Sequence, residues 1–438
     1  MLLKGNCLET LKTLADNSVD SIVTDPPYEL GFMGKSWDAS GIAYNQDLWA
    51  ECLRVLKPGG HLLAFSGSRT YQRMTVAIED AGFEIRDQIM WLYGSGFPKS
   101  LDVSKAIDKA AGAEREVVGQ NRYAARRPSE AANSPVGFSD SMGGSATANI
   151  TAPVTPEAQR WQGWGTALKP AHEPICVARK PLTGTVASNV LKWGTGALNI
   201  DGSRVGTETL GGGTMPDLRD VGRMSKEAIG IDKLSFGQTS GAKRIEHPEY
   251  TGRWPANVIH DGSEEVLAAF PTSKSGGLNG KSIFSAESTK TAASMFSGMA
   301  GKPRNYVSEP NEGSAARFFY CAKASKSERN AGLEGLPEKA VGALNMRTDA
   351  HSVKNGMDTK PAQNSHPTVK PLALMRYLVK LVTPPGGTVL DPFLGSGSTA
   401  VAAILEGFDW VGCEMTEDYW PIIEARVQWA ENQPRTLF

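Results

Sequence analysis

Cysteine is scarce in this chain of 438 residues, and long apolar runs are missing. The five cysteines are scattered and form no Cys-x-x-Cys pair, which argues against zinc ribbons and disulfide frameworks and leads us to expect no metal site. No stretch approaches the ~20 apolar residues that a membrane-spanning helix needs, and the N-terminus has no long apolar run. We therefore expect a soluble protein of a reducing cytoplasm, with no membrane contact.

The chain also lacks a strong charge of either sign, since 46 Lys and Arg balance 47 Asp and Glu. The distribution is more informative, because residues 115–360 hold 30 basic against 24 acidic side chains whereas the remainder holds 16 against 23. The middle of the chain is therefore the better candidate for contacts with phosphate groups. A surplus of this size is equally compatible with ordinary solvated surface.

Predicted strands and helices alternate in two separate parts of the chain, residues 2–93 and 371–429. Each part has the pattern of half of a doubly wound α/β sheet. Halves at opposite ends of the chain predict a circular permutation of the usual strand order. Between them, residues 129–156, 206–214 and 273–314 are rich in small and turn-forming residues, and we predict long loops there.

Two motifs follow predicted strands at opposite ends of the chain. They are Asp25-Pro26-Pro27-Tyr28, directly after Val19–Val23, and Asp391-Pro392-Phe393-Leu394-Gly395-Ser396-Gly397-Ser398-Thr399, directly after Thr388–Leu390. In an open α/β sheet the C-terminal strand edge is where ligands bind, so the fold can bring the two motifs together. Each alone has a structural explanation, because proline ends strands and glycine closes tight turns. Their co-occurrence, with Glu414 ending the next strand, favours a function.

The glycine-rich motif predicts a pocket for a nucleoside. Its glycines let the backbone approach a ligand closely, and Ser398 and Thr399 are candidates to cap the following helix. Glu414 lies about 20 residues past the loop, where a carboxylate binds ribose hydroxyls in dinucleotide-binding folds. No Gly-Lys-Ser/Thr follows the loop. The pattern thus favours a nucleoside without a triphosphate, such as S-adenosylmethionine.

The Asp25 motif suits the activation of an exocyclic amine. Such an amine is a poor nucleophile until acceptors hold its N–H groups, and the Asp25 carboxylate and the Pro26 carbonyl can be those acceptors. Two prolines stiffen the loop and keep the acceptors aimed. Tyr28 offers a ring that partly replaces the stacking a base loses when it leaves the duplex.

Together the motifs resemble those of the β-class site-specific DNA adenine-N6 methyltransferases of bacteria or phages, in which the catalytic motif precedes the cofactor motif. The resemblance covers roughly Leu3–Pro181 and His366–Val427. It implies a Rossmann-like methyltransferase sheet, mostly parallel with a reversed strand, and S-adenosylmethionine as cofactor. The implied catalytic residues are Asp25, Pro26, Pro27 and Tyr28, and the implied cofactor-binding residues are Asn6, Cys7, Asp25, His366, Thr368, Lys370, Asp391, Pro392, Phe393, Gly395, Ser396, Gly397, Ser398, Thr399 and Glu414.

Some positions leave alternatives open. The family often has aspartate where this chain has Asn6, whose amide oxygen can still accept a hydrogen bond from the cofactor adenine. His366 belongs to a His-Pro-Thr-x-Lys-Pro segment that the family places near the cofactor's methionine end, but it could instead cap the next helix. His172 and Glu173 stand in a family-like stretch and either touch substrate or are structural. Asp25 favours adenine, because cytosine-N4 enzymes commonly carry serine there.

The resemblance divides the chain into three parts. Residues 1–180 form the catalytic half, with a long loop at about 115–165, residues 181–360 form a target-recognition region, and residues 361–438 form the cofactor-binding half. The expected partner is double-stranded DNA read by a homodimer, and a restriction endonuclease partner is left open. The basic residues that we expect to contact DNA are Lys192, Arg253, Arg304 and Lys323.

Other functions fit less well. A cytosine-N4 DNA methyltransferase is the nearest alternative. Protein glutamine methyltransferases also use a Pro-Pro-Tyr loop, but they carry Asn in place of Asp25 and put the glycine loop first. A non-catalytic DNA-binding module would have no need of an intact Asp25 motif.

Overall fold

The computed structural model describes two compact units of the chain. The described residues are 1–30, 36–96, 100–120, 149–211, 214–216, 244–246, 249–275, 311–323, 325–340 and 361–434. The first unit comprises Met1–Ser203, Ala256–Val266 and Tyr320–Phe438, and the second comprises Arg204–Pro255 and Leu267–Phe319. The predicted target-recognition region, residues 181–360, therefore has parts in both units.

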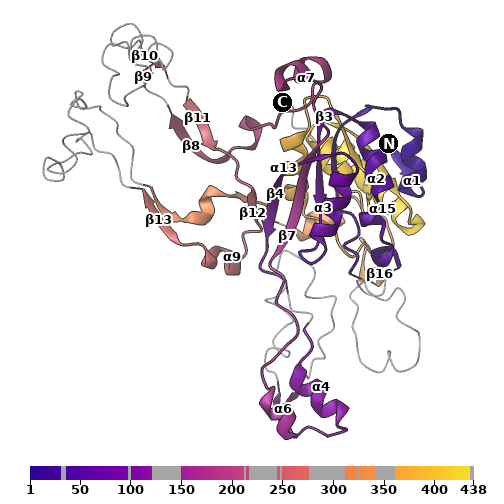
Figure 1. The fold of residues 1–438 in the computed structure, drawn as a ribbon, viewed down its shortest axis with the longest axis vertical. Coiled ribbons are helices and arrows are strands. Elements are labelled where there is room, and N and C mark those ends of the chain that lie inside the picture. The colour runs from indigo at the N-terminus through magenta and orange to yellow at the C-terminus, as the bar shows by residue number, and fades with distance from the viewer. Residues whose placement is uncertain are drawn as a thin grey trace, which may run out of the picture. The chain divides into compact units, whose positions relative to one another are not determined.

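A sheet of nine strands forms the centre of the first unit (Figure 1). In spatial order the strands are β1 (Leu2–Lys4), β19 (Asp409–Glu414), β18 (Thr388–Asp391), β2 (Val19–Thr24), β3 (Leu56–Phe65), β7 (His172–Arg179), β4 (Glu84–Leu92), β12 (Val258–His260) and β15 (Tyr320–Cys321). Neighbours pair in parallel except at β7, which is antiparallel to both β3 and β4. The predicted α/β class and mostly parallel sheet are confirmed.

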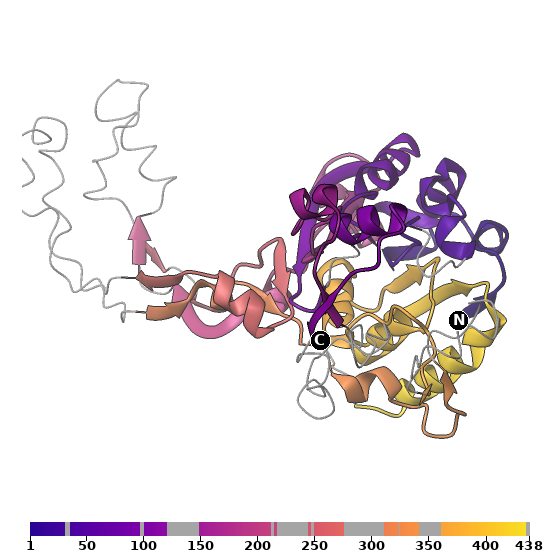
Figure 2. The same cartoon turned by 90° about the horizontal axis from the view of Figure 1, so that it is seen from below.

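The sheet joins the two ends of the chain. β18 and β19, from the C-terminal part, lie between β1 and β2, from the N-terminal part. Figure 2 shows the indigo N-terminal and yellow C-terminal segments side by side in this unit. The strands after which the two sequence motifs stand are direct neighbours, since Leu390 of β18 pairs with Ile22 of β2.

Helices cover both faces of the sheet because alternate side chains of its central strands are buried on opposite sides. Val23 and Leu63 belong to a core with helices α13 (Leu372–Val382) and α14 (Ser398–Leu405). Ile22 and Leu62 belong to a second core with α2 (Gln46–Val55) and α3 (Tyr71–Asp80). The remaining helices beside the sheet are α1 (Cys7–Thr10) and α15 (Trp420–Glu431).

The observed elements differ from the predicted ones in several places, of which two concern residues 206–214 and the helix after the glycine loop. Residues 206–214 were expected to form a loop, but β8 (Val205–Gly211) pairs antiparallel with β11 (Glu249–Arg253). Alternating Thr and apolar residues suit this ladder despite its glycines. The helix after the glycine loop begins at Ser398 with Gly397 at its N-cap and no side-chain cap, so Ser398 and Thr399 lie inside the helix and do not cap it.

The second unit consists largely of hairpins. β8 pairs with β11, and β13 (Thr272–Ser275) pairs with β14 (Asn311–Ser314). Arg253 forms an ion pair of 3.1 Å with Glu208 and lies over the ring of Phe318. Of the long loops predicted at 129–156 and 273–314, residues 129–148 and 276–310 lie outside the described residues. The prediction is wrong for residues 149–151, 273–275 and 311–314, which form short paired strands.

Within the first unit, a further group of elements precedes β7. It consists of α4 (Val103–Ala110), the hairpin β5 (Val117–Gln120) and β6 (Asn149–Thr151), and α6 (Pro156–Arg160). The buried Asp108 joins them, since it pairs with Arg115 at 2.7 Å and accepts from the backbone of Thr155 at 3.0 Å. Among the described residues no helix is long and apolar enough to cross a membrane.

Candidate active site

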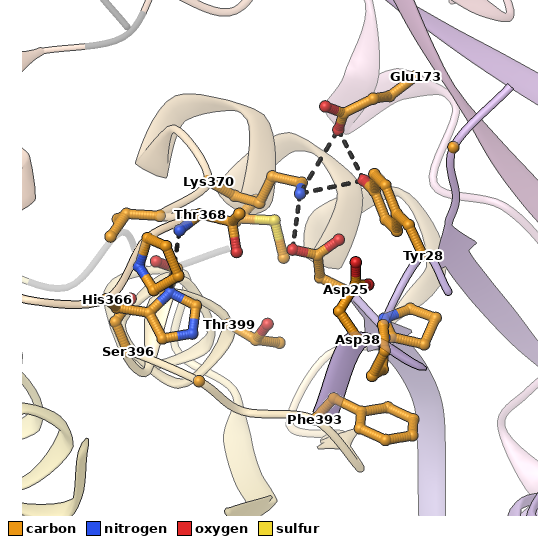
Figure 3. A pocket seen from close by; sticks show the side chains of 18 of the residues that line it. Asp25, Tyr28, Asp38, Glu173, His366, Thr368, Lys370, Phe393, Ser396 and Thr399 are labelled. Carbon is orange, nitrogen blue, oxygen red and sulfur yellow. Dashed lines mark hydrogen bonds and ion pairs between the residues drawn. The ribbon is translucent and has the colours of Figure 1, made fainter. Parts of the chain in front are cut away.

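A cavity of about 1440 Å³ opens at the C-terminal edge of the central sheet, within the first unit (Figure 3). Its wall comes from the residues that follow β1, β2, β18 and β19, from the segment that leads into β7, and from residues 366–371. All the predicted catalytic and cofactor-binding residues line it except Gly397, whose nearest neighbour is Ile423. The fold thus brings together residues from opposite ends of the chain.

Four side chains make a connected polar cluster in this cavity (Figure 3). Lys370 Nζ donates to Asp25 Oδ2 at 2.6 Å and to the Tyr28 hydroxyl at 3.2 Å. The Tyr28 hydroxyl donates to Glu173 Oε2 at 2.8 Å, and Glu173 Oε2 also lies 3.4 Å from Lys370 Nζ. Asp25 Oδ1 is buried and has no hydrogen-bond partner among the described residues. One oxygen of the Asp25 carboxylate is therefore held and the other is left open.

Electrostatics keep this cluster charged and ordered. Burial acts to lower the pKa of Lys370, but the carboxylates of Asp25 and Glu173 outweigh it and raise that pKa above its ordinary value. Burial raises the pKa of Glu173, and the Asp25 charge adds to the effect. Burial also raises the pKa of Tyr28 well above 10, so its hydroxyl keeps its proton and acts as a donor.

Asp391 anchors the glycine loop at its base. Its carboxylate accepts from the hydroxyls of Thr24 and Thr399, each at 2.6 Å, and from the backbone N–H of Phe393 at 2.9 Å. Burial raises the pKa of Asp391 to about 6. These bonds tie β18 to β2 and to α14, so the described contacts of Asp391 are structural although the residue lines the cavity.

Glu414 holds the other side of the loop. Its Oε2 accepts from Gly395 N at 2.8 Å, and its Oε1 accepts from Thr416 N at 2.7 Å. Each carboxylate oxygen keeps a second lone pair for a ligand. Gly395 has φ of +55°, and a Cβ built there would lie 2.7 Å from Nε2 of His366. Glycine is thus required by both backbone conformation and close approach.

His366 is a neutral side chain and does not cap a helix. Its Nδ1 accepts from Thr368 N at 3.3 Å, and α13 begins at Leu372 with Pro371 as N-cap. The ring meets Tyr419 edge-on, with ring centroids 4.7 Å apart. Burial, and then the charges of nearby Lys370, Arg329 and Arg426, lower the pKa of His366 to about 3.

Asn6 and Cys7 line the cavity from the start of α1. Asn6 is exposed, and its Oδ1 accepts from Leu8 N at 2.9 Å as the N-cap of that helix. Cys7 is buried, and burial raises the pKa of its thiol to about 11. The thiol is therefore inert at neutral pH.

Two arginines of the site were not predicted from the sequence. Arg426 is buried, and its Nη1 donates to the carbonyl of Ser396 at 2.7 Å and to the hydroxyl of Ser398 at 3.2 Å. Arg329 lines the cavity from α11 (Lys326–Asn330). Neither belongs to a recognisable motif, and a lone arginine on a helix gives no signal of its partner.

The residues expected to contact DNA are dispersed. Lys192 is exposed at the end of α7 (Val186–Trp193), and Lys323 is exposed after β15. Arg253 lies in the second unit, where it is paired with Glu208. Arg304 lies outside the described residues. None of the three described residues lines the cavity.

The sequence matches the model of a known protein family. That model, described as DNA methylase with N6 or N4 specificity, matches residues 19–182 and 223–425. The chain belongs to this DNA methylase family. Members of the family methylate an exocyclic amine of DNA, and S-adenosylmethionine is the cofactor.

Individual relatives match shorter stretches. The type II methyltransferase M.HpaI of Haemophilus parainfluenzae is 33% identical over 113 residues, which cover 24% of this chain and 36% of that protein. M.ScaI of Streptomyces caespitosus is 39% identical over 76 residues, which cover 17% of this chain and 24% of that protein. The chain thus spans between about a quarter and about a third of the length of these relatives.

Solved structures resemble the chain only distantly. The PvuII DNA methyltransferase, described as cytosine-N4-specific, is 12% identical with a TM-score of 0.41, covering 97% of this chain and 85% of that one. A DNA modification methylase from Thermus thermophilus is 14% identical with a TM-score of 0.37, covering 100% of this chain and 99% of that one. These likenesses leave the target base open.

The residues of the cavity fit S-adenosylmethionine. A Cβ at Gly395 would lie against the His366 ring, so glycine lets the loop and this ring form the cavity wall without filling the cavity. Glu414 would accept from the ribose hydroxyls, and the ring of Phe393 offers an apolar face to the nucleobase. When bound, the cofactor supplies an electrophilic methyl group on a sulfonium.

Proposed function

We propose that this protein is a site-specific DNA methyltransferase that transfers a methyl group to adenine N6 in double-stranded DNA, with the target base flipped out of the helix. The observation that carries the proposal is the state of Asp25. Its Oδ2 is held by Lys370 while its Oδ1 is buried without a partner among the described residues, in the same cavity as the glycine loop. A buried, unpaired acceptor is costly unless a ligand donates to it.

The acceptors of the Asp25 motif would activate the amine. Asp25 Oδ1 accepts one N–H of the target amine, and the Pro26 carbonyl is positioned in the same loop to accept the other. Holding both N–H groups directs the nitrogen lone pair out of the ring system and toward the methyl group. Bound S-adenosylmethionine would supply the methyl group to this nitrogen and leave as the neutral thioether, and Asp25 Oδ1 would accept the proton that the amine loses.

Tyr28 would hold the flipped base. Its hydroxyl is fixed between Glu173 and Lys370, and its ring packs against the hydrophobic core of the sheet. A ring fixed at both edges offers a preorganised stacking surface, which partly offsets the few kcal/mol that unstacking a base costs.

Adenine is preferred to cytosine because Asp25 stands where N6 enzymes commonly carry an acidic residue. Cytosine-N4 methylation makes the same chemical demands on the site, and nothing in the described cavity favours it. The order in which β2 precedes β18 in the chain supports the permuted β-class arrangement.

The remaining proposals concern the whole protein. The hairpins of the second unit, together with other parts of residues 181–360, would read the target sequence in duplex DNA. We also propose a homodimer acting on a palindromic site, by analogy with the family, within or outside a restriction-modification system.

The test is methyl transfer to plasmid DNA by the purified protein. The nucleosides of the product are then identified by mass spectrometry. We expect N6-methyladenine, and N4-methylcytosine would instead show that cytosine is the target base. Asp25→Ala should lower turnover by at least about a hundredfold, because a positioned acceptor is lost. Calorimetry should show that this variant still binds S-adenosylhomocysteine. Near-normal turnover in Asp25→Ala would reject the mechanism.

A further inference from the structure

Arg329 carries a charge that the described part of the protein leaves uncompensated. Its side chain lines the cavity, and its Nη2 donates to the His366 carbonyl at 3.1 Å. Its Nε is buried without a hydrogen-bond partner, and no carboxylate among the described residues lies within ion-pair distance. Burial lowers the pKa of Arg329, and no neighbouring acid offsets this effect.

Such an arrangement is unfavourable unless an anion enters. A buried, unpaired charge costs several kcal/mol, which a paired one largely recovers. The other buried cations of the cavity are already engaged. Lys370 pairs with Asp25 and Glu173, and Arg426 donates to the glycine loop. Arg329, which is partly exposed but has a buried Nε, is therefore the cation of the described cavity that is suited to an incoming anionic group.

Glu328 adds a second, opposite charge beside it. Its side chain lines the same cavity, and its Oε2 is buried without a partner in the described structure. Burial raises the pKa of Glu328. The two neighbouring side chains form no ion pair with each other within 4.0 Å in the described structure, although their charges would permit one. The charges of Arg376 and Arg426 act on Glu328, but no described cation forms an ion pair with it within 4.0 Å. A cation and an anion side by side in one cavity match a ligand that carries both charges.

We propose that Arg329 and Glu328 bind the zwitterionic amino-acid end of S-adenosylmethionine, with Arg329 taking the carboxylate and Glu328 the ammonium group. This inference rests on the proposed function. Figure 3 shows His366 and Thr368 across the cavity from Asp25 and Tyr28. Arg329 contacts His366, so it lies away from the base-binding residues. Glu414 is committed to the nucleoside side of the loop.

The alternative occupant, a DNA phosphate, fits less well. A phosphate carries negative charge only, so Glu328 would repel it, whereas an amino acid satisfies both side chains. The backbone that carries the pair is also held in place. Asn364 is fully buried, its Nδ2 donates to the Arg329 carbonyl at 2.9 Å, and its backbone N–H donates to Asn330 Oδ1 at 3.4 Å. Preorganisation of this kind lowers the entropic cost of binding.

The test compares two probes by calorimetry. S-adenosylhomocysteine has the amino-acid group, and 5′-methylthioadenosine lacks it. Arg329→Met should weaken binding of S-adenosylhomocysteine by about tenfold to a hundredfold, since a charge-assisted hydrogen bond is lost, and leave 5′-methylthioadenosine unaffected. Glu328→Gln should weaken the same probe alone. Arg69→Met is the matched control, because Arg69 lines the cavity but is exposed.

Three results would overturn the inference. One is equal affinity of wild type and Arg329→Met for S-adenosylhomocysteine. Another is an equal loss of affinity for both probes, which would mean that Arg329 only maintains the shape of the cavity. The third is a loss of DNA affinity with cofactor binding unchanged, which would assign a phosphate. If Arg329→Met does not fold, Arg329→Lys should show the same selective loss because it lacks the planar fork. A wild type that binds neither probe would instead reject the proposed function.

Discussion

At Gly395, both the backbone conformation and the close approach of a neighbouring side chain require glycine. Its φ of +55° is disfavoured for other residues by roughly 1–2 kcal/mol, and a Cβ would meet Nε2 of His366 at 2.7 Å. The His366 ring cannot easily retreat, because Tyr419 packs against it and Thr368 N donates to it. A methyl group at position 395 should therefore push His366 into the cavity wall.

We predict that Gly395→Ala lowers affinity for S-adenosylhomocysteine at least about tenfold, which corresponds to ~1.4 kcal/mol. Adding His366→Ala should restore part of the loss by removing the clash. Gly386→Ala is the control, since Gly386 also has a positive φ but a Cβ there meets nothing within 4 Å. Isothermal titration of the three variants measures the effect. Equal affinity for Gly395→Ala and Gly386→Ala would contradict the steric explanation.

At this scale, motif residues could be predicted from the sequence but their partners could not. Asp25 and Lys370 were each singled out, yet nothing in the chain indicates that Lys370 Nζ meets Asp25 across a separation of 345 positions. Asp391 looks like a ligand-binding acid, but in the described structure its carboxylate accepts hydrogen bonds from Thr24 and Thr399. The direction of a side chain depends on neighbours supplied by the whole fold.

β7 is the element that completes the site. It runs against its neighbours between β3 and β4 and delivers Glu173 at its start, next to Tyr28 and Lys370. Its apolar residues predicted a buried strand, but apolar character carries no information about strand direction. The position of Glu173 beside Lys370 favours a role that acts through Lys370.

We predict that Glu173→Gln lowers kcat without changing affinity for S-adenosylhomocysteine, because Lys370 loses one of its two carboxylate partners. Burial raises the pKa of Glu173 above 4.5, so acidification toward that pKa should protonate it and reduce kcat in the wild type. The variant should lack this acid limb. Neighbouring charges that face Glu173 are Lys370 and Asp25, and Tyr28 and Tyr93 stay protonated.

The contribution of Glu173 to folding stability should depend on pH in the opposite direction to kcat. A raised folded-state pKa means that the stability contribution of Glu173 is fully present below pH 4.5 and is lost as pH rises through the raised value. Glu173→Gln should therefore unfold at a temperature at or above that of the wild type at pH 7. The exposed Glu264→Gln is the control. A variant with wild-type kcat and an intact acid limb would remove Glu173 from the mechanism.

The sequence did not predict the shortest strands of the sheet, for a physical reason. β12 and β15, at the sheet edge, have three and two residues, too few to show a period of two. Tyr320 of β15 nevertheless stacks on Tyr377 of α13 with ring centroids 4.0 Å apart. The longer strands and helices on either side of the two motifs lie in residues 2–93 and 371–429, where alternating elements are predicted, because amphipathic or buried runs define them.

At the scale of the whole molecule, antiparallel hairpins flank several long segments of the chain. The chain enters through one strand and returns through its partner at β5–β6, β8–β11, β13–β14, and β16 (Lys339–Ala340) with β17 (Pro361–Ala362). Closing such a segment costs little extra entropy as it lengthens. The composition of the chain between the two halves of the sheet predicted interruptions of the catalytic fold. It could not predict to which unit each hairpin belongs, because that depends on contacts between residues far apart in the sequence.

The hairpin β13–β14 allows the recognition proposal to be tested by deletion. Ser275 pairs with Asn311, so residues 276–310 can be replaced by Asn-Gly, which closes a two-residue turn between the strands. We predict unchanged cofactor affinity and thermal stability, because the ladder is kept, with DNA affinity reduced at least about tenfold and a weaker salt dependence. Replacing residues 121–148 between Gln120 and Asn149 is the matched control in the first unit, outside the proposed target-recognition region. Fluorescence anisotropy with duplex DNA, and sequencing of methylated sites, measure the result. Unchanged DNA affinity and site choice after the 276–310 deletion would remove this hairpin from target recognition.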